Sequence, residues 1–255
     1  MHNNRPLILI SNDDGYHYKG IHTLIDVARR LGDVVVAVPA RHQSGMSSAI
    51  SIMDPTICRV MSEEPGLKVW EVQGTPADCV KLALSQLMDR RPDVVLAGIN
   101  HGFNTGVSTL YSGTMGAAFE GLMHGVPAVA YSIGDHRMEA ATEACVPYIE
   151  RITRRVLEQG LPADVCLNVN FPPQPPFAGV KVTKTDLGRW INEYEHRVNP
   201  SGRDYFWMGG EYEQRDPADD RTDLYWQRRN YVTVTPCHID QTDHQSMAQI
   251  AQMLL

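Results

Sequence analysis

The sequence predicts an α/β fold with a mostly parallel sheet. Short apolar runs such as Leu7–Ile10 and Val34–Val38 stop at polar loops, which is typical of buried parallel strands. Between them, Ile21–Leu31 has apolar residues at helical spacing and ends before Gly32. The first fifty residues are therefore expected to form a βαβ unit, which is right-handed in nearly all proteins.

The rest of the chain continues this alternation of strands and helices. Further strands are expected at Val69–Val72, Asp93–Ile99, Val126–Ser132, Val165–Phe171, Val180–Thr183 and Tyr231–Thr235. Helices are expected from Gly74 to about Met88 and over Thr114–His124, Glu139–Gln159 and Gln245–Leu255. In the first of these, Thr75 can be the N-cap and Pro76 suits the first helical position. Ile50–Met61 is expected to be an excursion with a short antiparallel piece.

Length and composition are those of an ordinary globular protein. The 255 residues suit one large α/β domain, or one domain with an appendage. The net charge of -7 argues against a nucleic-acid polymer or a membrane surface as partner. The five cysteines include no CxxC pair, so we expect buried free thiols in a reducing cytosol. We see no signal peptide and no membrane-spanning run, and we expect a cytoplasmic location.

Polar side chains follow the expected strands at their carboxyl ends, where ligands bind in open α/β sheets. Asp13 and Asp14 follow the first strand, Ser44 follows the second, and Asn100 follows the strand that ends at Ile99. Adjacent carboxylates repel each other unless a cation lies between them, and hard divalent cations prefer oxygen ligands. Each of these residues also suits an ordinary turn or loop. Their joint position favours a site for Mg²⁺ or Mn²⁺.

The loop Asn100–Ser112 is rich in glycine and hydroxyl groups and leads into the start of a helix. Free backbone N–H groups and the helix dipole can bind an anion there. The candidate phosphate-binding residues are Asn104, Ser112, Gly113 and Thr114. The loop matches neither a P-loop nor a dinucleotide fingerprint. N-capping and close helix packing explain the same residues and are compatible with anion binding.

Histidine and serine patterns point to no other catalytic centre. His101 lies within the third loop and is a candidate acid or base, whereas His42 and most other histidines are expected to be surface or structural residues. The chain has no HExxH spacing for zinc and no Gly-x-Ser-x-Gly nucleophile motif.

Residues 186–230 form a segment of different composition. It has many charges and eight aromatic residues: Trp190, Tyr194, Tyr205, Phe206, Trp207, Tyr212, Tyr225 and Trp226. The charges oppose a closed local core, whereas large aromatic side chains favour interfaces. We therefore expect an extended, hairpin-like arm that packs on a second subunit. The alternative is an arm folded back over its own sheet. The expected division is a core at 1–185, the arm at 186–230, and a strand and helix at 231–255 that return to the core.

Several motifs, in order, resemble the SurE family (survival protein E, 5′/3′-nucleotidase). They are Ser11-Asn12-Asp13-Asp14-Gly15, Arg41-x-x-Ser44-Gly45, Gly74-Thr75-Pro76-Ala77-Asp78-Cys79-Val80, Gly98-Ile99-Asn100-x-Gly102-x-Asn104, Tyr111-Ser112-Gly113-Thr114-x-x-Ala117-Ala118-x-Glu120-Gly121, Asn168-Val169-Asn170 and Thr235-Pro236-x-His238-x-Asp240-x-Thr242-x-His244. The match is dense over the first 130 residues or so and loose over 186–230.

The resemblance implies a Rossmann-like core and a metal-dependent phosphatase of nucleoside 5′- and 3′-monophosphates, with short polyphosphate as a further substrate. It implies that Asp13, Asp14, Ser44 and Asn100 hold one divalent metal cation per subunit. It also implies a homodimer or homotetramer with an exchanged C-terminal arm.

Two mechanisms and one rival function stay open. Asp13 or Asp14 can help to orient and activate water, or an aspartate can attack phosphorus to give a phosphoaspartate. The usual Asp-x-Asp pattern of the second route is absent. The rival function is a non-catalytic nucleotide-binding regulatory protein that uses the same loops.

Overall fold

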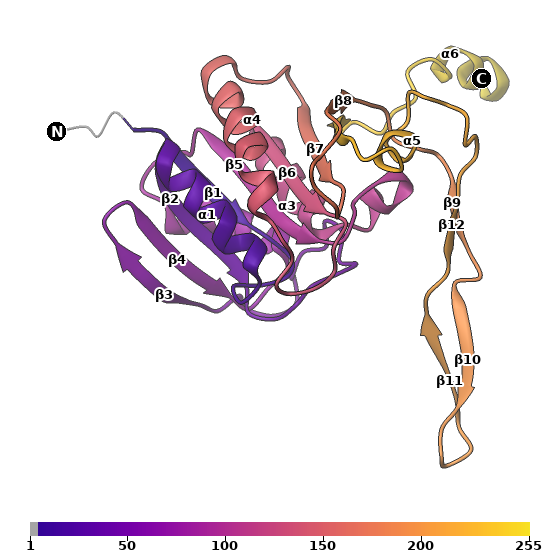
Figure 1. Ribbon diagram of the computed structural model, residues 1–255, viewed down its shortest axis with the longest axis horizontal. Coiled ribbons are helices and arrows are strands. Elements are labelled where there is room, and N and C mark those ends of the chain that lie inside the picture. Colours follow the sequence, from indigo (N-terminus) through magenta and orange to yellow (C-terminus); the bar gives the residue numbers. More distant parts are fainter. Residues whose placement is uncertain (1–4) are drawn as a thin grey trace.

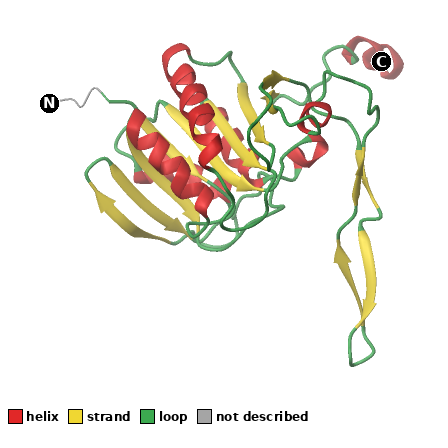
Figure 2. Ribbon diagram, viewed as in Figure 1, coloured by secondary structure: helices red, strands yellow, loops and turns green. Residues whose placement is uncertain are grey.

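A computed structural model describes residues 5–255, in which one nine-stranded sheet is flanked by helices on both faces (Figures 1 and 2). The strand order is β3-β4-β2-β1-β5-β6-β7-β13-β8. The strands of this sheet are β1 (Leu7–Ser11), β2 (Asp33–Pro39), β3 (Cys58–Glu64), β4 (Leu67–Val72), β5 (Val94–His101), β6 (Ala128–Ile133), β7 (Val165–Phe171), β8 (Val180–Val182) and β13 (Val232–His238).

The sheet is parallel at its centre and has one antiparallel strand pair toward each edge. From β4 to β7 every neighbouring pair is parallel. At one edge β3 pairs antiparallel with β4, and at the other β13 pairs antiparallel with β7 and carries β8 beside it. The expected parallel α/β sheet and the antiparallel excursion after the second strand are both confirmed.

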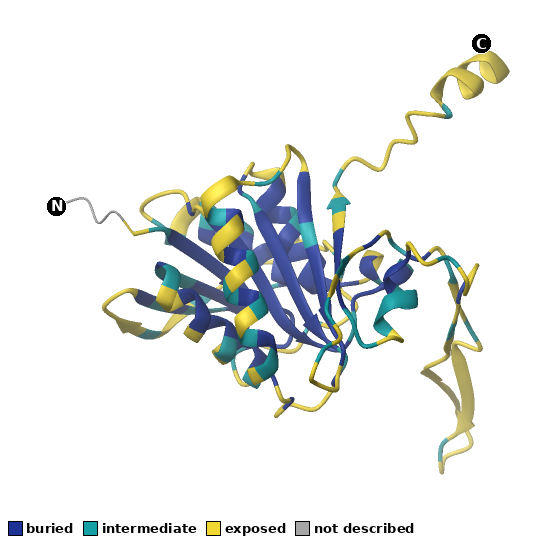
Figure 3. Cartoon of the chain, turned by 45° about the horizontal axis from the view of Figure 1, so that its top comes forward, coloured by how far each residue is buried: buried dark blue, intermediate teal, exposed yellow. Residues whose placement is uncertain are grey.

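Two pairs of helices cover the two faces of the sheet. The helices of the core are α1 (Lys19–Leu31), α2 (Pro76–Leu82), α3 (Gly113–Met123), α4 (Val146–Gln159) and the short α5 (Asp223–Gln227). Apolar side chains of α1 and α4 pack on one face, and those of α2 and α3 pack on the other. All five residues of β1 are buried between these layers, which explains its unbroken apolar run (Figure 3).

The helix starts follow local chemistry. α2 begins at the expected N-cap, Thr75, which accepts from the backbone N–H of Asp78. The Asp78 carboxylate accepts in turn from the Thr75 N–H, which completes a capping box. A π-helical turn over Ala83–Leu87 continues it. The prediction of one helix over Glu139–Gln159 is wrong at its start. A 3₁₀ turn, Glu143–Cys145, precedes α4, because Pro147 is suited to a helix's first turn and not to its interior.

The expected hairpin arm is confirmed and extends away from the sheet (Figure 1). β9 (Arg189–Ile191) pairs with β12 (Glu211–Glu213), and β10 (Tyr194–Val198) pairs with β11 (Asp204–Met208). We call residues 189–213 the β9–β12 arm. It is shorter than the predicted 186–230, because α5 packs against β13.

The β9–β12 arm does not fold back over its own sheet. Aromatic side chains of its β10–β11 hairpin are exposed, with exposed fractions of 62% for Tyr194, 61% for Phe206 and 60% for Trp207.

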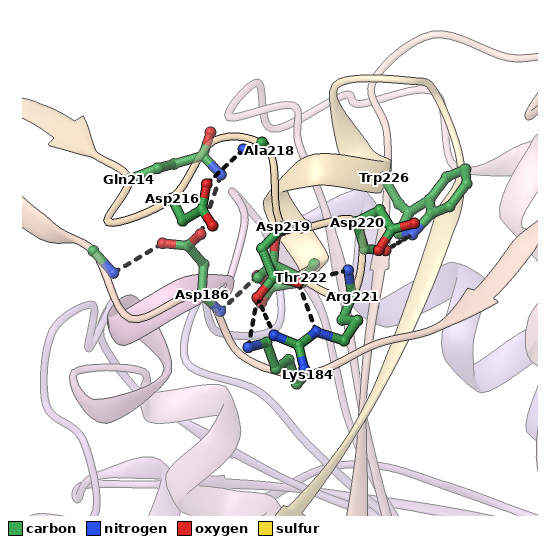
Figure 4. A network of polar contacts seen from close by, with 12 residues as sticks. Lys184, Asp186, Gln214, Asp216, Ala218, Asp219, Asp220, Arg221, Thr222 and Trp226 are labelled. Atoms are coloured by element: carbon green, nitrogen blue, oxygen red, sulfur yellow. Dashed lines mark hydrogen bonds and ion pairs between the residues drawn. The ribbon is translucent and has the colours of Figure 1, made fainter.

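A polar network holds the base of the arm (Figure 4). The buried Asp186 carboxylate accepts from the backbone N–H of Gly188 and from the Gln214 amide. The buried Asp223 carboxylate accepts from the backbone N–H groups of Asp186 and Gly106. Asp223 of α5 thus binds both the segment just before the arm and the loop after β5.

The C-terminal region divides in two. β13 returns to the sheet as expected, but α6 (Met247–Leu254) has no buried residue and lies apart from the core (Figure 3). The expectation that this helix returns to the core is therefore wrong within a single chain. Its apolar residues include Met253 and Leu254, which have no core surface to cover.

The five cysteines are free thiols, three of them buried. Within residues 5–255, no helix has both the length and the apolar character needed to cross a membrane.

Candidate functional site

Three loops meet at the carboxyl edge of the sheet because β2, β1 and β5 are adjacent parallel strands. Asp13 and Asp14 follow β1, Ser44 lies after β2, and Asn100 lies near the end of β5. The first two loops are joined directly, since the backbone N–H of Gln43 donates to the Asp13 carbonyl at 2.8 Å. The structure therefore brings the predicted metal ligands to one edge.

The turn after β1 fixes the two aspartates. The Asn12 side chain donates to the Gly15 carbonyl and accepts from the Gly15 N–H. Gly15 has a φ of +88°, which a residue with a side chain rarely adopts. This closed turn holds Asp13 and Asp14 with exposed fractions of only 3% and 4%.

Burial makes the two carboxylates costly to ionise together. Desolvation and the neighbouring charge of Asp13 raise the pKa of Asp14 to about 7. Desolvation also raises the pKa of Asp13, although hydrogen bonding from Thr114 opposes it. No lysine or arginine in the described part of the chain forms an ion pair with either carboxylate. The site therefore has negative charge without a fixed positive partner.

The start of α3 lies against Asp13. The Thr114 hydroxyl donates to Asp13 Oδ1, and Thr114 itself is fully buried. A Cβ at Gly113 would come within 2.9 Å of the Asp13 Cβ, so only glycine allows this close approach. Ser112 is the N-cap and accepts from the backbone N–H of Met115 at 3.1 Å. Sequence reasoning did not anticipate that the Thr114 hydroxyl faces Asp13.

Asn104 lies in a buried amide network behind the edge. Its side chain donates to the Ser132 hydroxyl at 2.8 Å, and its backbone N–H donates to Asn170 Oδ1 at 2.9 Å. Asn168 and Asn170 both donate to its carbonyl. β7 therefore anchors the glycine-rich loop, an arrangement that the motif Asn168-Val169-Asn170 signalled only through the family resemblance.

A change of register places Asn100. The pairing of β5 with β6 shifts between Ala97 and Asn100, and such irregularities re-aim side chains beside active sites. Gly98 allows it, with a φ of +126° and the Tyr131 carbonyl where a Cβ would lie. The Asn100 amide donates to the Gly102 carbonyl at 2.8 Å. Because Nδ2 makes this bond, the side-chain oxygen remains the ligand that Asn100 can offer.

His101 has a structural role. Its Nε2 accepts from the Gly20 N–H at 3.1 Å, and its Nδ1 lies 2.6 Å from the Arg137 carbonyl. Burial lowers the pKa of this imidazole. With both nitrogens bonded to the main chain, the ring has no free position for acid–base chemistry. Its backbone N–H donates to Asp14 Oδ2 at 3.0 Å.

His42 lies in the site, although the sequence analysis predicted only a surface or structural role for it. Its Nδ1 lies 3.3 Å from Asp14 Oδ1, and its Nε2 lies 2.6 Å from the Ser44 hydroxyl oxygen. The signal in the sequence was its place two residues before Ser44, in a loop at a strand's carboxyl end.

The donor chemistry of the site fits a hard divalent cation. Two desolvated carboxylates, one hydroxyl and one amide oxygen are ligands that Mg²⁺ and Mn²⁺ accept, with water completing the coordination. A cation would also offset the desolvation and the repulsion from Asp13 that raise the pKa of Asp14. Within residues 5–255, no group of three or more His, Cys, Asp and Glu side chains could hold a metal. The candidate site has two such side chains and depends on Ser44 and Asn100 for more.

Fold and site together define a Rossmann-like α/β protein with a paired-carboxylate centre at the carboxyl edge of its sheet. The chain belongs to the SurE family: the family model for survival protein SurE matches residues 8–192. It is 43% identical to a 5′-nucleotidase SurE of Phocaeicola vulgatus over 98% of this chain and 97% of the relative. It is 40% identical to a 5′-nucleotidase SurE of Bacteroides fragilis over 98% of both chains.

A solved structure supports the same assignment. The crystal structure of a SurE protein from Aquifex aeolicus superposes with a TM-score of 0.83 at 34% sequence identity. The match covers 97% of this chain and 99% of that one.

Proposed function

We propose that this protein is a 5′-nucleotidase, a phosphoric monoester hydrolase that converts nucleoside monophosphates to nucleoside and phosphate. The observation that carries the proposal is the pair of buried carboxylates, Asp13 and Asp14, against the start of α3. Full-length relatives named 5′-nucleotidase SurE support the reaction class. Activity on 3′-monophosphates and on short polyphosphate is the finer part of the proposal.

The proposed cofactor is one divalent cation per subunit, Mg²⁺ or Mn²⁺. The proposed ligands are Asp13, Asp14, Ser44 and Asn100, since their loops meet at one edge and supply only oxygen donors. When bound, the cation acts as a Lewis acid that neutralises charge on the phosphate.

The protein's own groups position the phosphate and the water. The start of α3, at Gly113 and Thr114, lies beside Asp13, and the N-terminus of a helix is a place suited to phosphate oxygens. Asn104 and Ser112 hold the loop that leads there and complete the proposed phosphate-binding set. Asp13 or Asp14 accepts a proton from the attacking water as its oxygen bonds to phosphorus and the phosphorus–oxygen ester bond breaks. That proton then passes to the leaving oxygen, so that nucleoside and phosphate are released. Attack by an aspartate to give a phosphoaspartate is the alternative route.

Hydrogen bonds from the same chain hold both buried carboxylates in place. Thr114 keeps the Asp13 carboxylate in one orientation, and the His101 N–H does the same for Asp14. Such fixed donors need little reorganisation during the reaction.

We also propose a homodimer or homotetramer held by the β9–β12 arm, and a cytoplasmic location. Exposed aromatic residues of the β10–β11 hairpin support the first proposal. The five free cysteines support the second.

The test of the function is phosphate release from a panel of nucleoside 5′- and 3′-monophosphates, with Mn²⁺, with Mg²⁺ and with EDTA. The proposal expects release that depends on the cation. Nucleotide binding without any release would instead indicate a regulatory nucleotide-binding protein. The same panel shows the base preference and the better metal.

A further inference from the structure

The His42 ring is fixed on three sides at the edge of the candidate site. Nε2 lies 2.6 Å from Ser44 Oγ, Nδ1 lies 3.3 Å from Asp14 Oδ1, and one face stacks on the Tyr18 ring. The centroids of these two rings are 5.8 Å apart and their planes differ by 24°. An exposed histidine would ordinarily sample several rotamers, so three contacts on a side chain that is 48% exposed indicate a defined position.

The partners of His42 are themselves held. Tyr18 packs edge-on against the His101 ring, with centroids 5.1 Å apart. The His101 ring is bonded to the backbone through both nitrogens, and its backbone N–H donates to Asp14. The contacts therefore form a closed circuit from Asp14 through His42, Tyr18 and His101 back to Asp14. Its anchoring points lie on the first loop and at the end of β5.

The two ring nitrogens of His42 contact different partners. Nε2 lies within hydrogen-bonding distance of the Ser44 hydroxyl oxygen, whereas Nδ1 lies near the Asp14 carboxylate. Whichever of the two atoms donates, the Ser44 oxygen keeps at least one lone pair that it can present to a cation.

We propose that His42 is a positioning residue that acts through Ser44: its hydrogen bond holds the Ser44 hydroxyl in one rotamer, with an oxygen lone pair directed toward the Asp13–Asp14 centre. This inference rests on the metal role proposed above. Groups that orient the ligands of a metal typically contribute 10–100-fold to metal affinity. Without His42, the exposed Ser44 side chain would be free to rotate. Binding of the cation would then have to fix the rotamer of Ser44, which lowers the affinity.

The test is Mn²⁺ binding to the metal-free protein, measured by the electron paramagnetic resonance signal of free Mn²⁺, with no substrate present. His42→Phe keeps a ring that can stack on Tyr18 but removes both nitrogens. We expect its Mn²⁺ dissociation constant to rise about 10–100-fold. His42→Gln keeps a polar side chain that can hydrogen-bond to the Ser44 hydroxyl, and it should recover part of that loss. His17→Phe is the matched control, because His17 is an exposed histidine of the neighbouring loop; it should bind like wild type.

A double-mutant cycle separates positioning from packing. If His42 acts through Ser44, His42→Phe adds almost nothing in a Ser44→Ala background. Additive losses, or wild-type affinity in His42→Phe, would overturn the proposal. Should the phenylalanine variant fail to fold, His42→Ala takes its place in the cycle. Absence of Mn²⁺ binding by wild type overturns this inference and the metal site together, whereas binding without phosphate release overturns only the proposed function.

Discussion

The carboxyl edge of the sheet and the β9–β12 arm bury their side chains in opposite ways. At the edge, polar groups such as Asp13 and Asn104 are buried and bonded to other residues of the same chain. In the arm, apolar surface such as Phe206 and Trp207 is left exposed. The buried polar groups of the edge therefore find their partners within one chain. The exposed apolar side chains of the arm have no surface of the same chain to pack against. This difference predicts that chemistry depends on the edge and assembly on the arm.

The largest expected effect follows from breaking the edge. Asp13→Asn or Asp14→Asn should lower the rate of phosphate release by at least ~100-fold, because each change removes a charged partner for the cation. The measurement is phosphate release from a nucleoside 5′-monophosphate at saturating Mn²⁺. Full activity of either variant in EDTA would falsify the metal role of the pair.

Ionisation of the same carboxylates should lower the free energy of unfolding of the metal-free protein. The folded-state pKa of Asp14 is raised to about 7, so its ionisation destabilises the fold as pH rises from about 4 through 7. Asp14→Asn should therefore stabilise the protein in EDTA at pH 8, by an amount on the order of a few kcal/mol, and the gain should shrink toward pH 4. Urea unfolding across this pH range measures it. A gain that grows as the pH falls would contradict the assigned burial.

A smaller effect is expected at the start of α3. Thr114→Val keeps the shape of the side chain but removes the hydroxyl that donates to Asp13. Loss of a hydrogen bond to a charged group costs about 1–3 kcal/mol. Because Asp13 would then be less well held, we expect that a higher metal concentration is needed for half-maximal activity. If the metal titration is unchanged and inhibition by inorganic phosphate weakens, the hydroxyl serves the phosphate instead.

Ser44→Ala should be milder than either aspartate change. A neutral hydroxyl contributes less to a cation than a carboxylate does, so kcat at saturating metal should stay near wild type while the metal requirement rises. An unchanged metal titration would show that Ser44 is not a ligand.

The same comparison shows which features a sequence encodes locally. The buried run Leu7–Ile10 and the Thr75 N-cap depend on neighbouring residues, and both were predicted correctly. The convergence of Asp13, Ser44 and Asn100 also follows from parallel topology, because adjacent parallel strands end at one edge.

Features that depend on distant partners were missed. The contacts of His42 join it to Asp14 and Tyr18, residues of another loop, so no local pattern distinguishes it from a surface histidine. The end of the arm near residue 213 depends on the buried Asp223 carboxylate, which binds the backbone of Asp186 and Gly106. No local pattern within residues 186–230 indicates that the arm ends near residue 213.

The most direct test of the division between edge and arm is a deletion that removes the distal hairpin and leaves its base. Ile191 and Glu211 are paired across β9 and β12, so residues 192–210 can be replaced by an Asn-Gly turn, which suits a tight hairpin. Phosphate release and light scattering are then measured on this variant beside wild type and Asp14→Asn. We predict a smaller species that still releases phosphate, while Asp14→Asn keeps the oligomer and loses activity. An inactive deletion variant with an unchanged oligomeric state would contradict the account.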